Sequence, residues 1–181
     1  MTLKDWGSFY VIIGSASAAL IGLQFVAMAL IADLPRQTSR HGIDAFSTPI
    51  TLHLSVCLFI AAVLSAPWQS LVALEVLLAA IGAAGFVYSL IIARRASRQS
   101  VYDPVLEDWI FHVVLPAAVY ATLVIGAAVL GRNGTWGLTA IGAATLVLVF
   151  VAIHNAWDNV TYLVALPTRD QAADSGPADA G

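Results

Sequence analysis

Long apolar runs with very few charged residues alternate with short polar segments along most of the chain. A helix needs about 20 apolar residues, each rising about 1.5 Å, to cross the hydrocarbon core of a bilayer. Five runs reach this length, and the pattern predicts transmembrane helices over residues 7–31, 48–66, 69–93, 107–131 and 136–162. The predicted fold class is all-α: a polytopic integral membrane bundle that forms one domain, residues 1–166.

The segments between the runs predict how the helices connect. Pro67 lies in the short link 66–69 and predicts a tight hairpin between the second and third helices. Turn-forming residues at 131–135 predict an equally short link before the last helix. Residues 33–47 are expected to form a connection with a short helix near residues 43–46. The small, polar and acidic tail, residues 167–181, is expected to be disordered.

Composition and charge narrow the class of protein. Hydrophobic residues make up 60% of the chain and charged residues 10%, against roughly 45–50% and about 25% in soluble domains. This composition excludes a soluble monomer and indicates the lipid bilayer as the surrounding medium. The net charge is −3 and no basic block is present, so nucleic acid is not expected as a partner. A single cysteine, Cys57, excludes a disulfide within the chain.

The positions of Lys and Arg predict the orientation, because short cytoplasmic loops retain positive charge. With five spans, two basic residues fall on the side of the N-terminus, Lys4 and Arg132. Six fall on the opposite side: Arg36, Arg40, Arg94, Arg95, Arg98 and Arg169. We therefore expect the N-terminus outside the cell and the C-terminus, with its acidic tail, in the cytoplasm.

Polar residues within the spans are the candidates for function, because such groups in hydrocarbon usually face the protein interior or an aqueous cavity. With the expected orientation, one group falls in the inner half of the membrane at similar depth: Gln24, His53, Tyr88, His112, His154 and Asn155. In the outer half only Glu75 stands out, and we expect it to be protonated or paired, with Arg132 the strongest base nearby.

Two histidines and two aspartates form the most distinctive pattern. Asp108 and His112 share one face of the fourth span, and His154 and Asp158 share one face of the fifth. If the intervening turn is centred on Asn133, antiparallel packing places Asp108 opposite Asp158 and His112 opposite His154.

Several roles for this cluster remain open. The four residues His112, His154, Asp108 and Asp158 could bind a divalent metal ion such as zinc, manganese or iron. Two of the histidines, His53 included, could instead be axial ligands of a haem, or the same groups could pass protons. The simplest reading is structural, with the histidines hydrogen-bonded between the two helices.

Small residues at four-residue spacing, Gly14, Ala18 and Gly22, predict a close helix contact on the first span, which would suit a homo-oligomer.

The chain resembles a group of uncharacterised small bacterial membrane proteins. The resemblance rests on segments 9–11, 18–23 and 25–27 with Gly14, and on the string His154-Asn155-Ala156-Trp157-Asp158. It implies five spans in the bacterial plasma (inner) membrane. Some similar sequences carry the name modulator of FtsH protease, which would imply a membrane protease as partner.

Together these features predict a multi-pass membrane protein that binds a metal ion through the His/Asp cluster. The alternatives are a membrane-embedded enzyme or proton-coupled carrier that uses the same residues, and a structural or protease-modulating membrane partner.

Overall fold

The computed structural model describes residues 3–32, 40–96 and 106–165; its side chains are described except at 31–32, 40–47, 95–96, 108 and 162–165. The helices follow one another in this order: η1 (Leu3–Trp6), α1 (Gly7–Ala32), α2 (Arg40–Ser65), α3 (Leu71–Ala96), α4 (Leu106–Trp109), η2 (Ile110–Val114), α5 (Leu115–Leu130) and α6 (Gly134–Ala165). The described part of the chain is helical with no strand, as the apolar pattern predicts.

Five helical segments are long and apolar enough to cross a membrane, which confirms the expected number. They cover Leu3–Leu30, Thr48–Ser65, Leu71–Arg94, Ile110–Leu130 and Gly134–Thr161. The α2 helix begins at Arg40, so the short helix expected near residues 43–46 is part of its first turns. The expected acidic tail, residues 167–181, lies outside the described residues.

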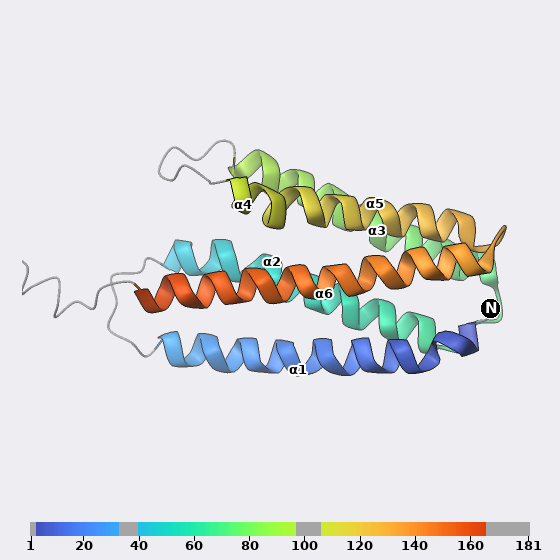
Figure 1. Ribbon diagram of the computed structural model, residues 1–181, viewed down its shortest axis with the longest axis horizontal. Helices are drawn as coiled ribbons and strands as arrows, with labels where there is room; N and C mark the ends of the chain where they lie inside the picture. The colour runs from blue at the N-terminus through green and yellow to red at the C-terminus, as the bar shows by residue number, and fades with distance from the viewer. Residues whose placement is uncertain (1–2, 33–39, 97–105, 166–181) are drawn as a thin grey trace, which may run out of the picture.

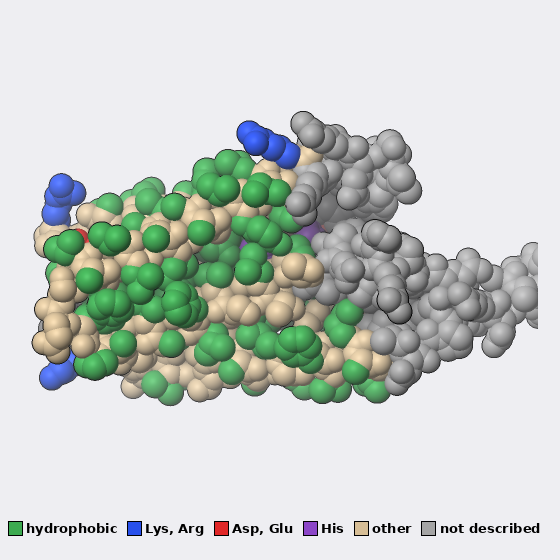
Figure 2. Space-filling model, turned by 180° about the vertical axis from the view of Figure 1, so that it is seen from behind, with side chains coloured by type: hydrophobic (Ala, Val, Ile, Leu, Met, Phe, Trp, Pro, Cys, Tyr) green, Lys and Arg blue, Asp and Glu red, His purple; other side chains and the backbone are tan. Residues whose placement is uncertain are grey.

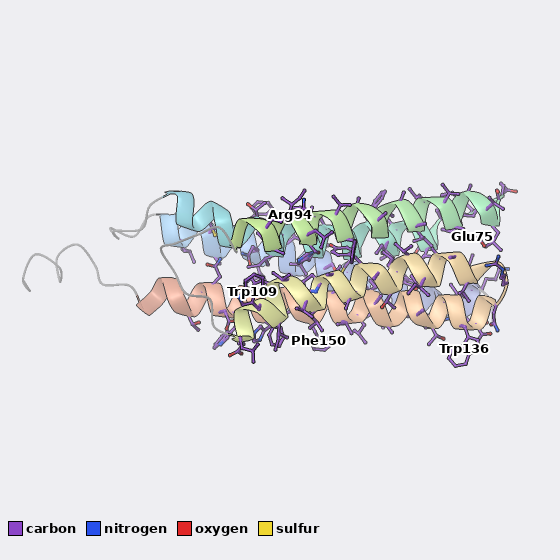
Figure 3. All side chains as sticks on the ribbon, turned by 90° about the horizontal axis from the view of Figure 1, so that it is seen from above. Glu75, Arg94, Trp109, Trp136 and Phe150 are labelled. Carbon is purple, nitrogen blue, oxygen red and sulfur yellow. The ribbon has the colours of Figure 1, made fainter. Side chains whose placement is uncertain are left out.

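The helices pack as a bundle in which neighbours in sequence are not always neighbours in space (Figure 1). α5 packs against both α3 and α6, while α2 packs against both α6 and α1. Figure 3 labels Glu75 and Trp136 at one end of the bundle, here called the Glu75 end, and Arg94 and Trp109 towards the other, here called the Arg94 end.

We expected the second and third spans to form a tight hairpin. The link between them, after Ser65, is short, but α2 and α3 make little contact along their length, and α3 packs on α5 instead. Two glycines of α3 explain this choice. A Cβ on Gly82 would lie 3.0 Å from the Tyr120 carbonyl oxygen, and a Cβ on Gly85 would collide with the Tyr120 ring. The missing side chains therefore let α5 approach α3 closely.

The packing of α5 against α6 follows the predicted antiparallel register. A Cβ on Gly126 would lie 3.2 Å from the Cβ of Ala140, and these two residues are equally far from Asn133 in sequence. The Asn133 side chain caps α6 by accepting a hydrogen bond from the Trp136 backbone N–H at 3.2 Å. The short turn therefore fixes which residues of the two helices lie opposite one another.

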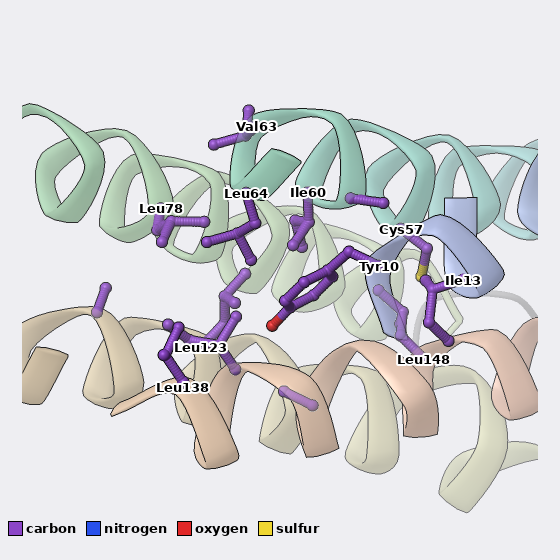
Figure 4. Packing of buried hydrophobic residues seen from close by; sticks show 14 of the residues in the cluster. Tyr10, Ile13, Cys57, Ile60, Val63, Leu64, Leu78, Leu123, Leu138 and Leu148 are labelled. Carbon is purple, nitrogen blue, oxygen red and sulfur yellow. The ribbon is translucent and has the colours of Figure 1, made fainter. Parts of the chain in front are cut away.

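The buried groups are unevenly distributed along the bundle. Large apolar side chains fill the interior of the Glu75 half, where Tyr10, Leu64, Leu78, Leu123 and Leu138 pack together (Figure 4). A much smaller apolar cluster, Ile50, Leu54 and Ala152, lies nearer the Arg94 end. Several buried polar side chains share that region: Gln24, His53, Ser89, Asn155 and Asn159. The Glu75 half is therefore the apolar core, and the Arg94 half is the polar one.

The outer surface of the helices is apolar, as a surface in contact with lipid requires. Large hydrophobic side chains such as Leu23, Phe25 and Phe150 are more than 60% exposed. Figure 2 shows hydrophobic side chains spread over the helices of the face in view, with Lys and Arg side chains near the ends of the described part.

The first helix is attached most firmly at the Glu75 end. The Trp6 ring lies against Gly142 of α6, where a Cβ would collide with it, and it packs edge to face with Phe9 at a centroid distance of 5.3 Å. Further along α1, a Cβ on Gly14 would lie 3.2 Å from the Cβ of Ala61 in α2. Gly14 is therefore used inside the bundle, whereas Gly22 faces open space.

We predict that Gly85→Ala destabilises the bundle by about 1–3 kcal/mol, because the added methyl group forces Tyr120 and α5 away from α3. Gly22→Ala is the matched control: nothing lies within 4 Å of its Cβ position, so it should be neutral or stabilising by about 0.5–1 kcal/mol. Thermal unfolding in detergent, followed by circular dichroism, measures both. Equal effects of the two substitutions would contradict this packing.

Candidate functional site

The polar residues expected at one level do lie in the same part of the bundle, but they divide into separate contacts. Phe111 and Asn155, equally far from Asn133, are in contact between η2 and α6. His53 of α2 meets Tyr120 of α5, and Gln24 of α1 lines a groove with residues of α6. The common depth predicted for these residues therefore agrees with the packing of four helices.

A π-helical turn interrupts the fourth span where these groups meet. In η2 the Leu115 N–H donates to the Ile110 carbonyl, five residues back, instead of to the Phe111 carbonyl. The next residue, Pro116, has no N–H. The Phe111 carbonyl is consequently left without its usual helical donors.

Asn155 of α6 satisfies this carbonyl. Its side-chain Nδ2 donates to Phe111 O at 3.3 Å. Asn155 is only 1% exposed, and its Oδ1 has no hydrogen-bond partner among the described residues. This amide therefore ties α6 to the interrupted helix through a backbone group, and it does so at the level of the histidines.

His154, the neighbour of Asn155, lies beside two carboxylates. Its Nε2 is 3.2 Å from Asp158 Oδ2, one turn along α6, and 3.7 Å from Glu107 Oε1 of α4. The imidazole stacks on the Phe111 ring at a centroid distance of 3.6 Å. Its Nε2 is shielded from solvent and makes no hydrogen bond with any described side chain, while the Glu107 and Asp158 side chains are 65% and 45% exposed. His154 Nε2 thus faces two carboxylates whose side chains are exposed.

His53 lies in a second group, deeper between the helices. Its Nδ1 and the Tyr120 hydroxyl are hydrogen-bonded at 2.8 Å, and both residues are buried. Tyr88 of α3 approaches the His53 ring edge to face, with centroids 6.5 Å apart. His112 interacts electrostatically with His53. Three helices and η2 therefore contribute to this group.

Of the predicted four-residue metal set, His154 and Asp158 lie side by side, and Glu107, which is outside the predicted set, is the next carboxylate to His154. Among the described side chains, no group of three or more His, Cys, Asp and Glu is placed to hold a metal ion. The side chain of Asp108 lies outside those described. Metal and haem binding stay predictions from the sequence.

Glu75 was expected to be either protonated or paired. Within the described part of the chain, no ion pair joins it to Arg132; its carboxylate lies against Gly131 in the turn between α5 and α6. Glu75 is only four residues inside α3, at the end of the bundle (Figure 3), so the carboxylate can reach the polar headgroup region.

Three residues of these sites did not emerge from the sequence. In the sequence alone, Glu107 is interpreted as a charge at the positive end of a helix, and Phe111 and Tyr120 are interpreted as ordinary apolar positions. The proline at 116 was the one available signal, because it implies a free carbonyl about one turn earlier.

A scan against family models gave no match for this chain, and searches of curated proteins and of solved structures gave none either. The resemblance to small bacterial membrane proteins therefore stays a prediction.

We predict that Asn155→Leu destabilises the protein by about 1–3 kcal/mol, because it leaves the part-buried Phe111 carbonyl without a donor. In the Pro116→Ala background the loss should be smaller, since the new N–H at position 116 can reach that carbonyl. A double-mutant cycle of unfolding free energies measures the coupling. Strictly additive effects would show that Asn155 does not replace the missing helical hydrogen bond.

Proposed function

We propose that the chain is a multi-pass plasma-membrane protein that accepts protons at His154 and passes them on, as in proton-coupled carriers. In this proposal the Arg94 end faces the cytoplasm, in line with the positive charges on that side. The observation that carries the proposal is the position of His154 Nε2, which is shielded from solvent yet 3.2 Å and 3.7 Å from two carboxylate oxygens.

Histidine suits this task because its charge changes near neutral pH. A proton on Nε2 would face Asp158 and Glu107, whereas an unprotonated Nε2 would present its lone pair to the same two carboxylates. The exposure of these carboxylates gives protons a route to the ring from the cytoplasmic side. Ionisable residues within membrane spans commonly serve proton relays.

The hydrogen-bonded His53 and Tyr120 would be the next groups along such a route. Both can donate and accept protons, and they are joined by a hydrogen bond of 2.8 Å. The π-helical turn beside them would supply the local backbone adjustment that such turns often provide at functional sites.

We predict proton uptake into liposomes that contain the purified protein when a potassium gradient makes the lumen negative, read with a pH-sensitive dye. His154→Gln should reduce the rate by about 100-fold, the factor that a positioned proton-transfer group typically contributes. Glu75→Gln is the control, because this carboxylate lies at the opposite end of the bundle (Figure 3) and should leave the rate unchanged.

An uptake rate equal to that of protein-free liposomes would overturn the proposal. So would one metal ion per chain in the purified protein that is absent from the His154→Gln variant, since the site would then hold a metal instead of a proton.

A further inference from the structure

A groove between α1 and α6 lies on the outside of the bundle in its Arg94 half. Its volume is about 250 Å³, and its walls include Leu20, Gln24 and Ala27 of α1 and Ala152, Ala156 and Trp157 of α6. Leu54 of α2 also lines it. Apart from Gln24, the lining is apolar. Two of the α6 residues that α1 faces here, Ala152 and Ala156, are small and leave space between the two helices.

Gln24 distinguishes this groove from an ordinary apolar surface. The residue is only 9% exposed and lines the groove. Among the described residues none forms a hydrogen bond with its carboxamide. In hydrocarbon an unpaired amide is unfavourable by several kcal/mol on transfer scales, about 4–8 from water to an alkane. The occupant of the groove is therefore expected to bring a hydrogen-bonding group to Gln24.

The depth of Gln24 indicates which group that is. The apolar segment Leu3–Leu30 has 28 residues, so it is about 42 Å long and exceeds a hydrocarbon core of about 30 Å. If the segment is centred, it extends about 6 Å beyond the core at each end. Gln24 lies six residues, or about 9 Å, before Leu30. Its carboxamide is then about 3 Å inside the hydrocarbon boundary, next to the level of the lipid esters.

Trp157 supports the same level independently. It lines the groove and is 69% exposed, and tryptophan prefers the membrane interface, where its ring contacts apolar chains and its N–H meets polar groups.

We propose that this groove binds one acyl chain of a glycerolipid from the leaflet at the Arg94 end, with an ester carbonyl that accepts a hydrogen bond from Gln24 Nε2. The apolar walls contact the acyl chain, and the hydrogen bond from Gln24 distinguishes an ester from an ether. This lipid site does not depend on proton transfer at His154, which lies on a different contact of α6.

The test compares an ester lipid with its ether analogue, which has no carbonyl. The full-length protein is incubated in mixed micelles with equal amounts of dioleoyl phosphatidylcholine and the dialkyl ether lipid of the same chain length. After washing with detergent, mass spectrometry counts the retained lipids. The wild-type protein should retain about one lipid per chain and prefer the ester by about fivefold, the factor that corresponds to one hydrogen bond.

Two variants and one control make the result specific. Gln24→Leu should abolish the preference for the ester, and Ala27→Phe, which fills the groove, should abolish retention of both lipids. Ala19→Phe adds the same ring to an exposed position of α1 outside the groove and should behave as the wild type. Thermal unfolding of each variant shows that it is folded.

Equal retention of the ester and the ether by the wild type would overturn the role of Gln24. Lipid retention by a folded Ala27→Phe variant at the wild-type level would overturn the groove as the binding site. A wild-type dimer that becomes monomeric in Ala27→Phe, without lipid retention in either, would assign the groove to a second copy of the chain and would also overturn the proposal.

Discussion

The hydrogen bond from Asn155 to the Phe111 carbonyl joins α6 to the fourth span at a point where the helix leaves this carbonyl without its usual donors. In lipid, backbone polar groups need partners within the protein. The turn η2 and Pro116 remove the usual donors of this carbonyl, and α6 replaces them with a side chain. The contact sets the position of α6 relative to η2, so it also determines that His154 meets Glu107 and stacks on Phe111. The His154 group is therefore positioned by this contact.

Close packing in the other half has a different origin. There the helices approach one another through glycines, with Gly85 beneath Tyr120, Gly126 facing Ala140 and Gly142 against Trp6. Because lipid chains are as apolar as the core, helix association in membranes depends on such close contacts and on interhelical hydrogen bonds. The Glu75 half of the bundle is held by close glycine contacts, and the Arg94 half is held by interhelical hydrogen bonds. Tyr120 belongs to both, since its ring packs on Gly85 and its hydroxyl is hydrogen-bonded to His53.

The sequence was sufficient for the fold class and the five helices, because a run of 20 apolar residues has few other uses. It was also sufficient for the register of the last two helices, since the short turn at Asn133 leaves little freedom. The partner of α3 was not predictable, because it depends on whether Gly82 and Gly85 face α2 or α5. The position of a residue in the sequence gives its depth in the membrane, but it does not give the neighbouring helix that the residue faces. The same limitation applies to the histidines. Their common level followed from spacing, but the division into a His154 group and a His53 group depends on side-chain directions that the π-helical turn shifts.

The weak contact between α2 and α3 bears on how the bundle is assembled during synthesis. Helices enter the membrane in chain order, and α3 arrives before α5, the helix against which it packs. Until α5 has been inserted, Gly82 and Gly85 must face lipid or a chaperoning partner, and only α1 and α2 form a settled pair. The bundle can therefore be completed only after the C-terminal third of the polypeptide has been inserted. Truncation after α3 is expected to leave an unassembled intermediate that membrane quality control can degrade.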